Sequence, residues 1–131
     1  MNKHKNDRGY RNELGARGED AAEEAVRERG MVILKRNYAV HNVGELDIVA
    51  EQNGDIHIFE VRARLNIGTY PESEESVGRA KQRKVMRTAE CFIDEEGLYD
   101  RNVVFEVIKV THDEQGNILG IEFVPDRKSV V

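Results

Sequence analysis

The sequence predicts an α/β fold of the α+β type, in which a mixed central β-sheet is flanked by helices in the order αβββαββ. Helical periodicity over residues 13–29 and again over 74–96 supports this prediction. Three short runs rich in apolar and β-branched residues lie between these two helical stretches, and two more such runs follow residues 74–96. Several strands mixed with two helices indicate a sheet packed against helices.

The chain opens with a basic stretch, residues 1–12, which we expect to be a flexible tail. Residues 13–131 have a length that suits a single domain. The predicted first helix, 13–29, stops at Gly30, a residue typical of helix C-termini. Its buried side is formed by Leu14, Ala21, Ala22, Ala25 and Val26. The run MVILKRNYAV, residues 31–40, follows as the first strand.

The stretch GELDIVAEQNGDIHIFEVRAR, residues 44–64, predicts two strands joined by a turn at Asn53-Gly54, the strongest short hairpin signal. Counting outward from the turn, the predicted cross-strand pairs are Gln52 with Asp55, Ala50 with His57, Val49 with Ile58, Ile48 with Phe59, Asp47 with Glu60, Leu46 with Val61 and Glu45 with Arg62. Because side chains alternate between faces, one face is a core face of Leu46, Ile48, Phe59 and Val61. The other face places Asp47 directly across from Glu60.

The second half of the chain completes the sheet. Residues 63–73 are predicted to be a loop, and the helix at 74–96 ends near Gly97. Two further strands, at 102–110 and 118–124, are separated by the turn sequence EQGN.

The composition excludes several classes of protein. No run approaches the roughly 20 apolar residues of a membrane span, and the N-terminus lacks the apolar segment of a signal peptide. Cys91 is the only cysteine, which leaves no internal disulfide and predicts a reducing, cytoplasmic location. The histidines His41, His57 and His112 do not have the spacing of a zinc site.

The net charge of −5 does not suggest a nucleic-acid-binding protein, but the distribution of charge is uneven. The segment RAKQRKVMR carries five cations and no acid: Arg79, Lys81, Arg83, Lys84 and Arg87. A local basic stripe of this kind can bind phosphates, or it can be an ordinary solvated face of a helix. Charge alone favours the second of these readings.

Like charges directly opposite each other on a sheet are destabilising, so the pair of Asp47 and Glu60 needs a compensating cation. A divalent metal ion would supply it, since Mg²⁺ prefers one or two carboxylates together with waters and phosphate. Arg62 would also supply it, as a salt bridge without any metal. Both readings stay open at this stage.

The helices add further candidates. Glu19 lies at the edge of the buried side of the first helix, where a glutamate can simply stabilise the helix start. Lys81 falls within the buried sector of the second helix, and Lys84 falls at its edge. A lysine that faces the protein body either extends to solvent along the surface or points at an anion.

The order of these residues resembles the restriction-endonuclease-like PD-(D/E)xK superfamily: a helix with an acid, a strand with Asp, a strand with Glu-x-basic and a helix with Lys. More closely, the chain resembles the YraN family of small bacterial endonuclease-like proteins, which are similar to Holliday-junction resolvases. The matching segments are GARGEDAAEEAV, ILKRNYAV, GELDIVA, IFEVRAR, SVGRAKQRKVMRTAECFI and VFEVIKV.

The resemblance implies that residues 13–131 form a single nuclease-like domain of restriction-endonuclease-like fold. It implies that Asp47 and Glu60 bind Mg²⁺ or Mn²⁺ with the backbone carbonyl of Val61. Glu19 matches a helix acid that can complete such a site. Lys81, followed by Gln82, matches the basic–Gln signature of the second helix. Catalytic roles are thereby implied for Asp47, Glu60, Arg62, Lys81 and Glu19.

Arg62 is a departure, because nucleases of this superfamily usually carry lysine at that position. Arginine stays protonated and cannot accept a proton from water, although it can stabilise negative charge. Backbone contacts to nucleic acid, most naturally DNA, are expected from Arg79, Lys81, Arg83, Lys84 and Arg87. Tyr70 is a candidate for stacking on an unpaired base or for a packed loop aromatic.

Three functions follow as hypotheses. The first is a metal-dependent endonuclease that hydrolyses phosphodiester bonds of structured or branched DNA. The second is an inactive nucleic-acid-binding relative in which Arg62 replaces the catalytic lysine. The third is a scaffold for a protein partner. By analogy with junction-resolving relatives, a homodimer is expected, and no membrane association is expected.

Overall fold

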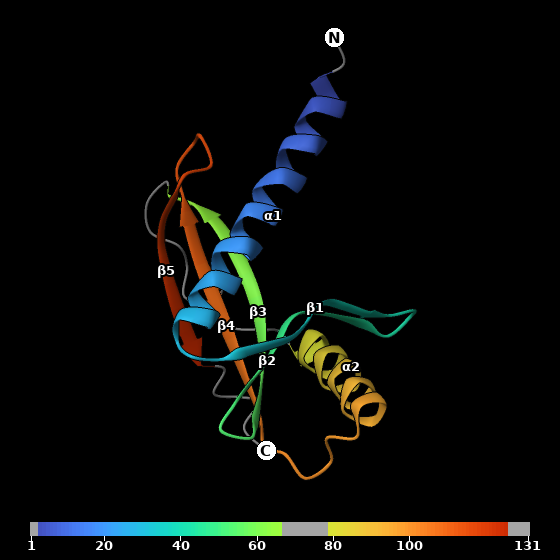
Figure 1. Cartoon of the computed structure of the whole chain (residues 1–131). Helices are drawn as coiled ribbons and strands as arrows, with labels where there is room; N and C mark the ends of the chain where they lie inside the picture. Colours follow the sequence, from blue (N-terminus) through green and yellow to red (C-terminus); the bar gives the residue numbers. More distant parts are fainter. Residues whose placement is uncertain (1–2, 67–78, 126–131) are drawn as a thin grey trace.

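The computed structural model describes residues 3–66 and 79–125; within the helices, the side chains of 3–12, Leu14 and Arg79 lie outside the described part. The elements follow the predicted order αβββαββ (Figure 1). They are α1 (Lys3–Glu28), β1 (Val32–Val40), β2 (Gly44–Gln52), β3 (Asp55–Leu65), α2 (Arg79–Glu96), β4 (Val103–His112) and β5 (Ile118–Pro125).

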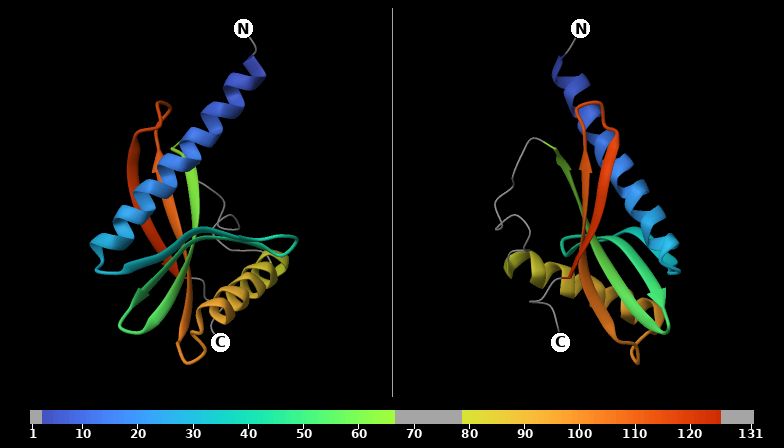
Figure 2. Two further views of the ribbon diagram at one scale, coloured as in Figure 1. Left: turned by 45° about the vertical axis from the view of Figure 1, so that its right-hand side comes forward. Right: turned by 90° about the vertical axis from the view of Figure 1, so that its left-hand side faces the viewer.

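The five strands form one mixed sheet in the order β1-β2-β3-β4-β5. Strands β3 and β4 are parallel, and each other neighbouring pair is antiparallel. A parallel pair needs a crossover connection, which here contains α2. The two helices lie on opposite faces of the sheet, as the two views of Figure 2 show. The predicted α+β class and restriction-endonuclease-like order are therefore confirmed.

Each face of the sheet is buried under one helix, so the protein has two core clusters. Under α1 the core consists of Ala22, Val26, Met31, Ile48, Ala50, Phe59, Ile108 and Val110. Under α2 it consists of Leu46, Val49, Ile56, Ile58, Ala89 and Phe92. Successive β3 residues such as Ile58 and Phe59 therefore serve different cores, as strand alternation requires.

The predicted core face is wrong at Leu46, which packs under α2 while Ile48 packs under α1. Strand β1 changes face at the same level. The side chain of Arg36, paired with Ile48, reaches α1, whereas Tyr38, paired with Leu46, contacts Phe92 of α2. Asn37 between them has a positive φ of 51°, which interrupts the regular alternation. The two strands bend together, and Asp47 lies at this bend.

Two boundaries, those of α1 and β3, differ most from the expected ones. Helix α1 begins at Lys3, ten residues before the predicted start at 13, and its first turns extend beyond the sheet (Figure 1). Strand β3 continues to Leu65, into the segment 63–73 predicted as a loop, because it pairs with β4 over this length. The rest of that loop, with Tyr70, and residues 74–78 of the predicted second helix lie outside the described residues.

Helix α2 lies close to the start of β2 because Gly44 has no side chain. A Cβ atom at Gly44 would be 2.7 Å from Oγ1 of Thr88, which is fully buried and donates to the carbonyl of Lys84. This contact places the N-terminal half of α2 against the segment that carries Asp47.

Candidate functional site

The β2–β3 hairpin has the predicted register next to its turn, from Gln52↔Asp55 to Ile48↔Phe59. The register ends at that pair, so the predicted direct pairing of Asp47 with Glu60 is not part of the ladder. Instead, the carboxylate of Asp47 accepts a hydrogen bond of 2.8 Å from the backbone N–H of Val61. The side chain thus takes the place of a backbone acceptor at the point where the ladder ends.

The backbone of Val61 faces Asp47 at the end of the β2–β3 ladder. In an extended strand the N–H and C=O of one residue point to the same side. Since the N–H of Val61 points at Asp47 of β2, its carbonyl oxygen points to the same side. The carboxylate of Asp47 and this carbonyl are therefore oxygen atoms on the same side of β3.

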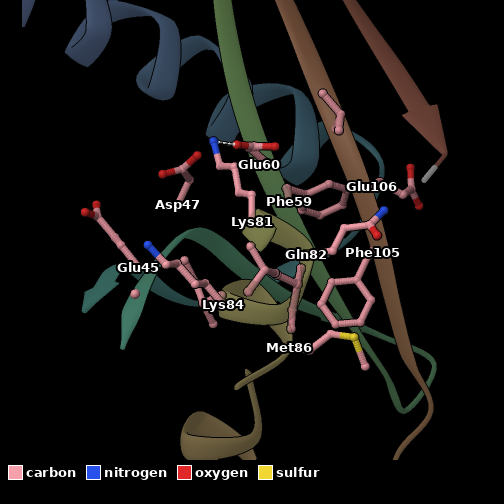
Figure 3. A pocket seen from close by; sticks show the side chains of 15 residues that line it. Glu45, Asp47, Phe59, Glu60, Lys81, Gln82, Lys84, Met86, Phe105 and Glu106 are labelled. Carbon is pink, nitrogen blue, oxygen red and sulfur yellow. Dashed lines mark ion pairs between the residues drawn. The ribbon is translucent and has the colours of Figure 1, made fainter. Parts of the chain in front are cut away.

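Glu60 lies between two cations. Its Oε2 is 3.3 Å from the guanidinium of Arg62, and its Oε1 forms an ion pair with the ammonium of Lys81 (Figure 3). The side chains of Glu60 and Arg62 are 14% and 12% exposed, whereas that of Lys81 is 59% exposed. The sequence left open a salt bridge from Arg62 to the acid pair, and this salt bridge is present at Glu60 of the same strand, since residues two apart share a face.

Asp47 lies in an environment that disfavours its charge. Burial raises its pKa to about 6 from the ordinary 3.8, and the hydrogen bond from Val61 acts in the opposite direction. The negative charges of Glu19, Glu60 and Glu45 raise it further. Glu19 on α1, Asp47 on β2 and Glu60 on β3 thus interact electrostatically, although they come from three separate elements.

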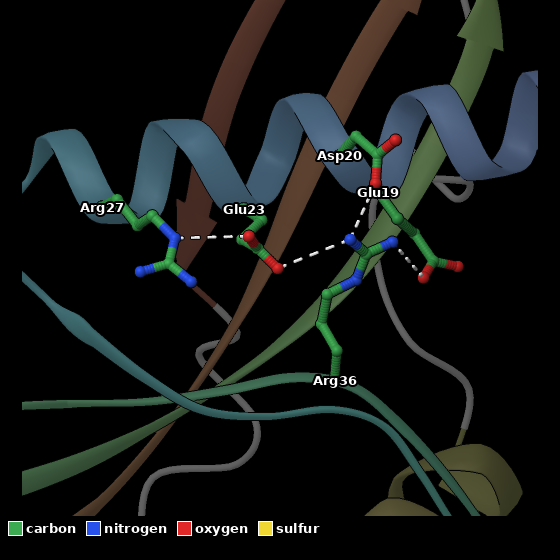
Figure 4. A network of polar contacts seen from close by, with 5 residues as sticks. All are labelled: Glu19, Asp20, Glu23, Arg27 and Arg36. Atoms are coloured by element: carbon green, nitrogen blue, oxygen red, sulfur yellow. Dashed lines mark hydrogen bonds and ion pairs between the residues drawn. The ribbon is translucent and has the colours of Figure 1, made fainter.

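The contact of Glu19 with Arg36 was not foreseen from the sequence. Arg36 of β1 bonds to Asp20 at 2.7 Å, to Glu23 at 3.4 Å and to Glu19 at 3.5 Å (Figure 4). The hydrogen bond that Arg36 donates to Asp20 is the largest cause that raises the pKa of the Arg36 guanidinium. This arginine holds Glu19 beside the site; no periodicity in the sequence indicates which helix acids it meets.

Asp47 and Glu60 open into a pocket of about 270 Å³ between the sheet and α2 (Figure 3). Lys81, Gln82 and Lys84 of α2 line the side opposite the two acids. Lys81, predicted within the buried sector of this helix, and Lys84, predicted at its edge, both line the pocket, although both residues are exposed. Two of the other predicted phosphate-binding residues, Arg83 and Arg87, are exposed on α2 outside the pocket lining, and the side chain of Arg79 is not described.

The donor set partly fits a divalent metal ion. Within residues 3–66 and 79–125, no group of three or more Asp, Glu, His or Cys side chains could hold one. Two carboxylates and the Val61 carbonyl are nevertheless the hard oxygen ligands that Mg²⁺ and Mn²⁺ accept. Lys81 is largely exposed and can leave Glu60 at little cost, whereas the side chain of Arg62 is only 12% exposed and stays beside Glu60. Asp47 and Val61 fit as they stand, and Glu60 fits once Lys81 moves.

In the described part of the chain no helix is long and apolar enough to span a membrane. A solved structure described as an fdxN element excision controlling factor protein from Anabaena variabilis is 18% identical, covers 81% of this chain and 98% of that one, and has a TM-score of 0.37. This likeness is too low to carry an argument.

Sequence relatives are more informative. A UPF0102 protein of Dictyoglomus turgidum is 35% identical over 87% of this chain and 95% of its own length. A UPF0102 protein of Persephonella marina is 38% identical over 76% and 84%. The profile of Uncharacterised protein family UPF0102 matches residues 18–110, which include Asp47, Glu60 and Lys81. The chain therefore belongs to family UPF0102, the YraN family that its motifs resemble.

Proposed function

We propose that this protein is a metal-dependent endonuclease that hydrolyses phosphodiester bonds of structured or branched DNA in the cytoplasm. One observation carries the proposal: two carboxylates of the sheet and two lysines of α2 line one pocket, where Lys81 pairs with Glu60. Carboxylates and ammonium groups in one pocket suit a metal ion bound to a phosphate, because the carboxylates neutralise the metal ion and the ammonium groups neutralise the phosphate.

In this proposal the acidic residues bind the metal ion and the basic residues bind phosphate. Asp47, the carbonyl of Val61 and Glu60 are the groups that would hold Mg²⁺ or Mn²⁺. When bound, such an ion lowers the pKa of a coordinated water and offsets charge on the scissile phosphate. Lys81 exchanges Glu60 for a phosphate oxygen, and Lys84 holds a neighbouring phosphate. Arg62 stabilises negative charge near Glu60 and takes no proton from water.

A second candidate function rests on the contacts of Glu60. Both of its carboxylate oxygens already face cations, one from Arg62 and one from Lys81. A site neutralised in this way needs no metal ion, which favours a relative that binds nucleic acid without cleaving it. The pair of Arg62 and Glu60 is the contact that separates the two candidates.

Cleavage of defined DNA substrates tests the first candidate. The full chain is incubated with duplex, flap and four-way-junction DNA in the presence of Mg²⁺ or Mn²⁺. We expect metal-dependent cleavage of the branched substrates that Asp47→Asn abolishes. The matched control Asp100→Asn changes an exposed acid in the loop after α2 and should leave cleavage intact. No cleavage by the wild type on any substrate would contradict the proposal.

Thermal stability separates the two candidates without relying on cleavage. A ligand that binds only the folded state raises the melting temperature. Under the first candidate, Mn²⁺ raises it for the wild type and not for Asp47→Asn. Under the second, Mn²⁺ does not change the melting temperature of the wild type. Arg62→Lys then creates a shift, because lysine is less bulky than arginine and does not fill the metal site.

A homodimer, expected by resemblance to junction-resolving enzymes, stays a prediction that light scattering measures.

A further inference from the structure

The pocket next to Asp47 and Glu60 has two chemically different ends (Figure 3). The polar end contains the acids and lysines to which the nuclease proposal assigns a metal ion and a phosphate. The other end is lined by apolar groups, namely Ile58, Val85, Met86, Phe105 and Val107. A metal-bound phosphate uses only the polar end, so the apolar end has no role in the proposed hydrolysis.

The apolar end has a closed floor and an accessible rim. Ile58 and Val107 are 3% and 2% exposed and form the floor. Met86 is 37% exposed, and the half-buried ring of Phe105 lies beside Gln82 in Figure 3. An aromatic face and a thioether offer stacking and soft contact to a flat ring.

We infer that this end of the pocket binds one unpaired nucleobase of the nucleic acid whose phosphate lies at the Asp47–Glu60 end. The inference rests on the proposed function and adds a substrate class to it: DNA with an unstacked nucleotide. The whole pocket, polar and apolar ends together, has a volume of about 270 Å³, just below the roughly 300–1,000 Å³ of drug-sized ligand sites, which suits one nucleotide rather than a larger ligand. A base in an intact duplex is stacked on both faces and cannot enter.

The charges of the pocket select this occupant over an apolar small molecule. Lys81 and Lys84 lie on the same helix as Met86 and line the same pocket, so the ligand joins a flat apolar ring to an anion. Glu106 also lines the pocket, but its carboxylate lies 3.7 Å from His57 on the strand next to it. A nucleotide within a single strand carries both groups at the required short distance.

Binding without catalysis tests the inference. The full chain is titrated by fluorescence anisotropy, in EDTA and at low salt, with a short single-stranded oligonucleotide and with an abasic oligomer of equal length. Both probes carry the same phosphates, and only the first carries bases. Stacking of one base contributes about 1–3 kcal/mol, so we expect the wild type to bind the first probe about 5- to 150-fold more tightly.

Variants locate the preference. Phe105→Leu keeps an apolar side chain in the α2 core but removes the aromatic face, and Met86→Ala changes only the exposed rim. Each should reduce the preference for the base-containing probe at least threefold and leave affinity for the abasic probe unchanged. Tyr99→Ala removes an aromatic ring that is 68% exposed outside the pocket, and it should change neither affinity.

The outcomes distinguish this inference from the nuclease activity. Equal affinity of the wild type for the two probes, or a preference that survives both pocket variants, overturns the base site even if the protein cleaves DNA. A preference that both variants reduce supports the site even if no cleavage is found. Loss of affinity for both probes in either variant also counts against it, because the abasic oligomer does not use the apolar end.

Discussion

Asp47 carries a charge that the folded protein would be more stable without. Its pKa of about 6 in the fold exceeds the ordinary value of 3.8, chiefly because the carboxylate is buried. Between these two pH values the folded state binds more protons than the unfolded state, so stability falls as pH rises through this window. A carboxylate that costs stability and lines a pocket is characteristic of functional sites.

The first prediction is that Asp47→Asn stabilises the metal-free protein at neutral pH. One pKa unit corresponds to about 1.4 kcal/mol; after discounting for partial exposure we expect a gain of roughly 1–2 kcal/mol in the free energy of unfolding. The amide oxygen can still accept the hydrogen bond from Val61. Urea denaturation in EDTA at pH 7.5 and at pH 4 measures the effect, which should largely vanish at the lower pH.

Asp100→Asn is the control for this prediction, because Asp100 is exposed and lies outside the pocket lining. It should change the free energy of unfolding by less than about 0.5 kcal/mol at either pH. If Asp47→Asn were equal to or less stable than the wild type at pH 7.5, the buried charge would not be the destabilising feature described above.

At the scale of elements, the approach of α2 to β2 depends on Gly44. The second prediction is that Gly44→Ala destabilises the fold by about 1–3 kcal/mol, since its Cβ would lie 2.7 Å from Oγ1 of Thr88. Chemical denaturation measures this change. On β5, Gly120 has no atom within 4 Å of an added Cβ, so Gly120→Ala serves as the control and should be nearly neutral.

A double variant identifies the cause of that loss. Thr88→Ala removes the oxygen that the new methyl group would meet, together with the hydrogen bond to the carbonyl of Lys84. If steric overlap is the cause, Gly44→Ala should cost less stability in the Thr88→Ala background than in the wild type. Equal costs in the two backgrounds would mean that the clash is not the reason.

The contact between α1 and β1 depends on Arg36. The third prediction is that Arg36→Met destabilises the protein by about 1–3 kcal/mol, because three helix acids lose their contact with Arg36 and the charge of Glu19 near Asp47 is no longer offset by it. Arg27→Met is the control. Arg27 also pairs with Glu23, but its side chain is 57% exposed against 27% for Arg36.

The exposed Arg27 pair should contribute only about 0.3–0.5 kcal/mol, as helix pairs of this spacing do. Thermal denaturation of the two variants at equal ionic strength therefore compares a half-buried with an exposed arginine on the same acid. Losses of similar size for Arg36→Met and Arg27→Met would show that the network of Figure 4 is only a surface feature.

At the scale of the whole molecule, the net charge of −5 is distributed so that α2 presents cations beside the pocket. The fourth prediction is that Arg83→Ala and Arg87→Ala each weaken DNA binding about equally for all sequences. Each should also reduce the slope of log affinity against log salt by about 0.7–0.9, since each would lose one phosphate contact. Anisotropy titrations over a salt series measure both quantities.

Arg27→Ala is the control for charge, because it removes one cation from α1 on the opposite face of the sheet. It should leave the salt slope unchanged. If all three variants lowered the affinity alike, the protein would attract DNA through its overall charge rather than through α2.

Local sequence patterns were sufficient for the order of elements, the hairpin register next to Asn53-Gly54 and the side of α2 on which Lys81 lies. These features depend on turn chemistry and periodicity, which act over a few residues. The early start of α1 was missed because a polar, charged helix has no apolar stripe over its first turns.

The bend at Asn37 and Asp47 could not be derived from the hairpin alone. Strict alternation placed Leu46 beside Ile48, whereas the positive φ of Asn37 and the two covering helices assign them to opposite cores. The same bend ends the β2–β3 ladder and lets Asp47 accept from Val61 instead of pairing with Glu60. Counting cross-strand pairs outward from one turn describes two strands only, so it cannot show how β1 or a helix changes their geometry.

By itself the sequence determined the fold class, the family and the identity of the candidate acids and lysines, because these follow from local periodicity and motif order. Only the tertiary structure decided which charges meet: Arg62 and Lys81 on Glu60, and Arg36 on the acids of α1. It also decided that an apolar end adjoins the acids in one pocket. Such contacts join elements far apart in the chain, and their packing distances are set by the folded sheet and helices together.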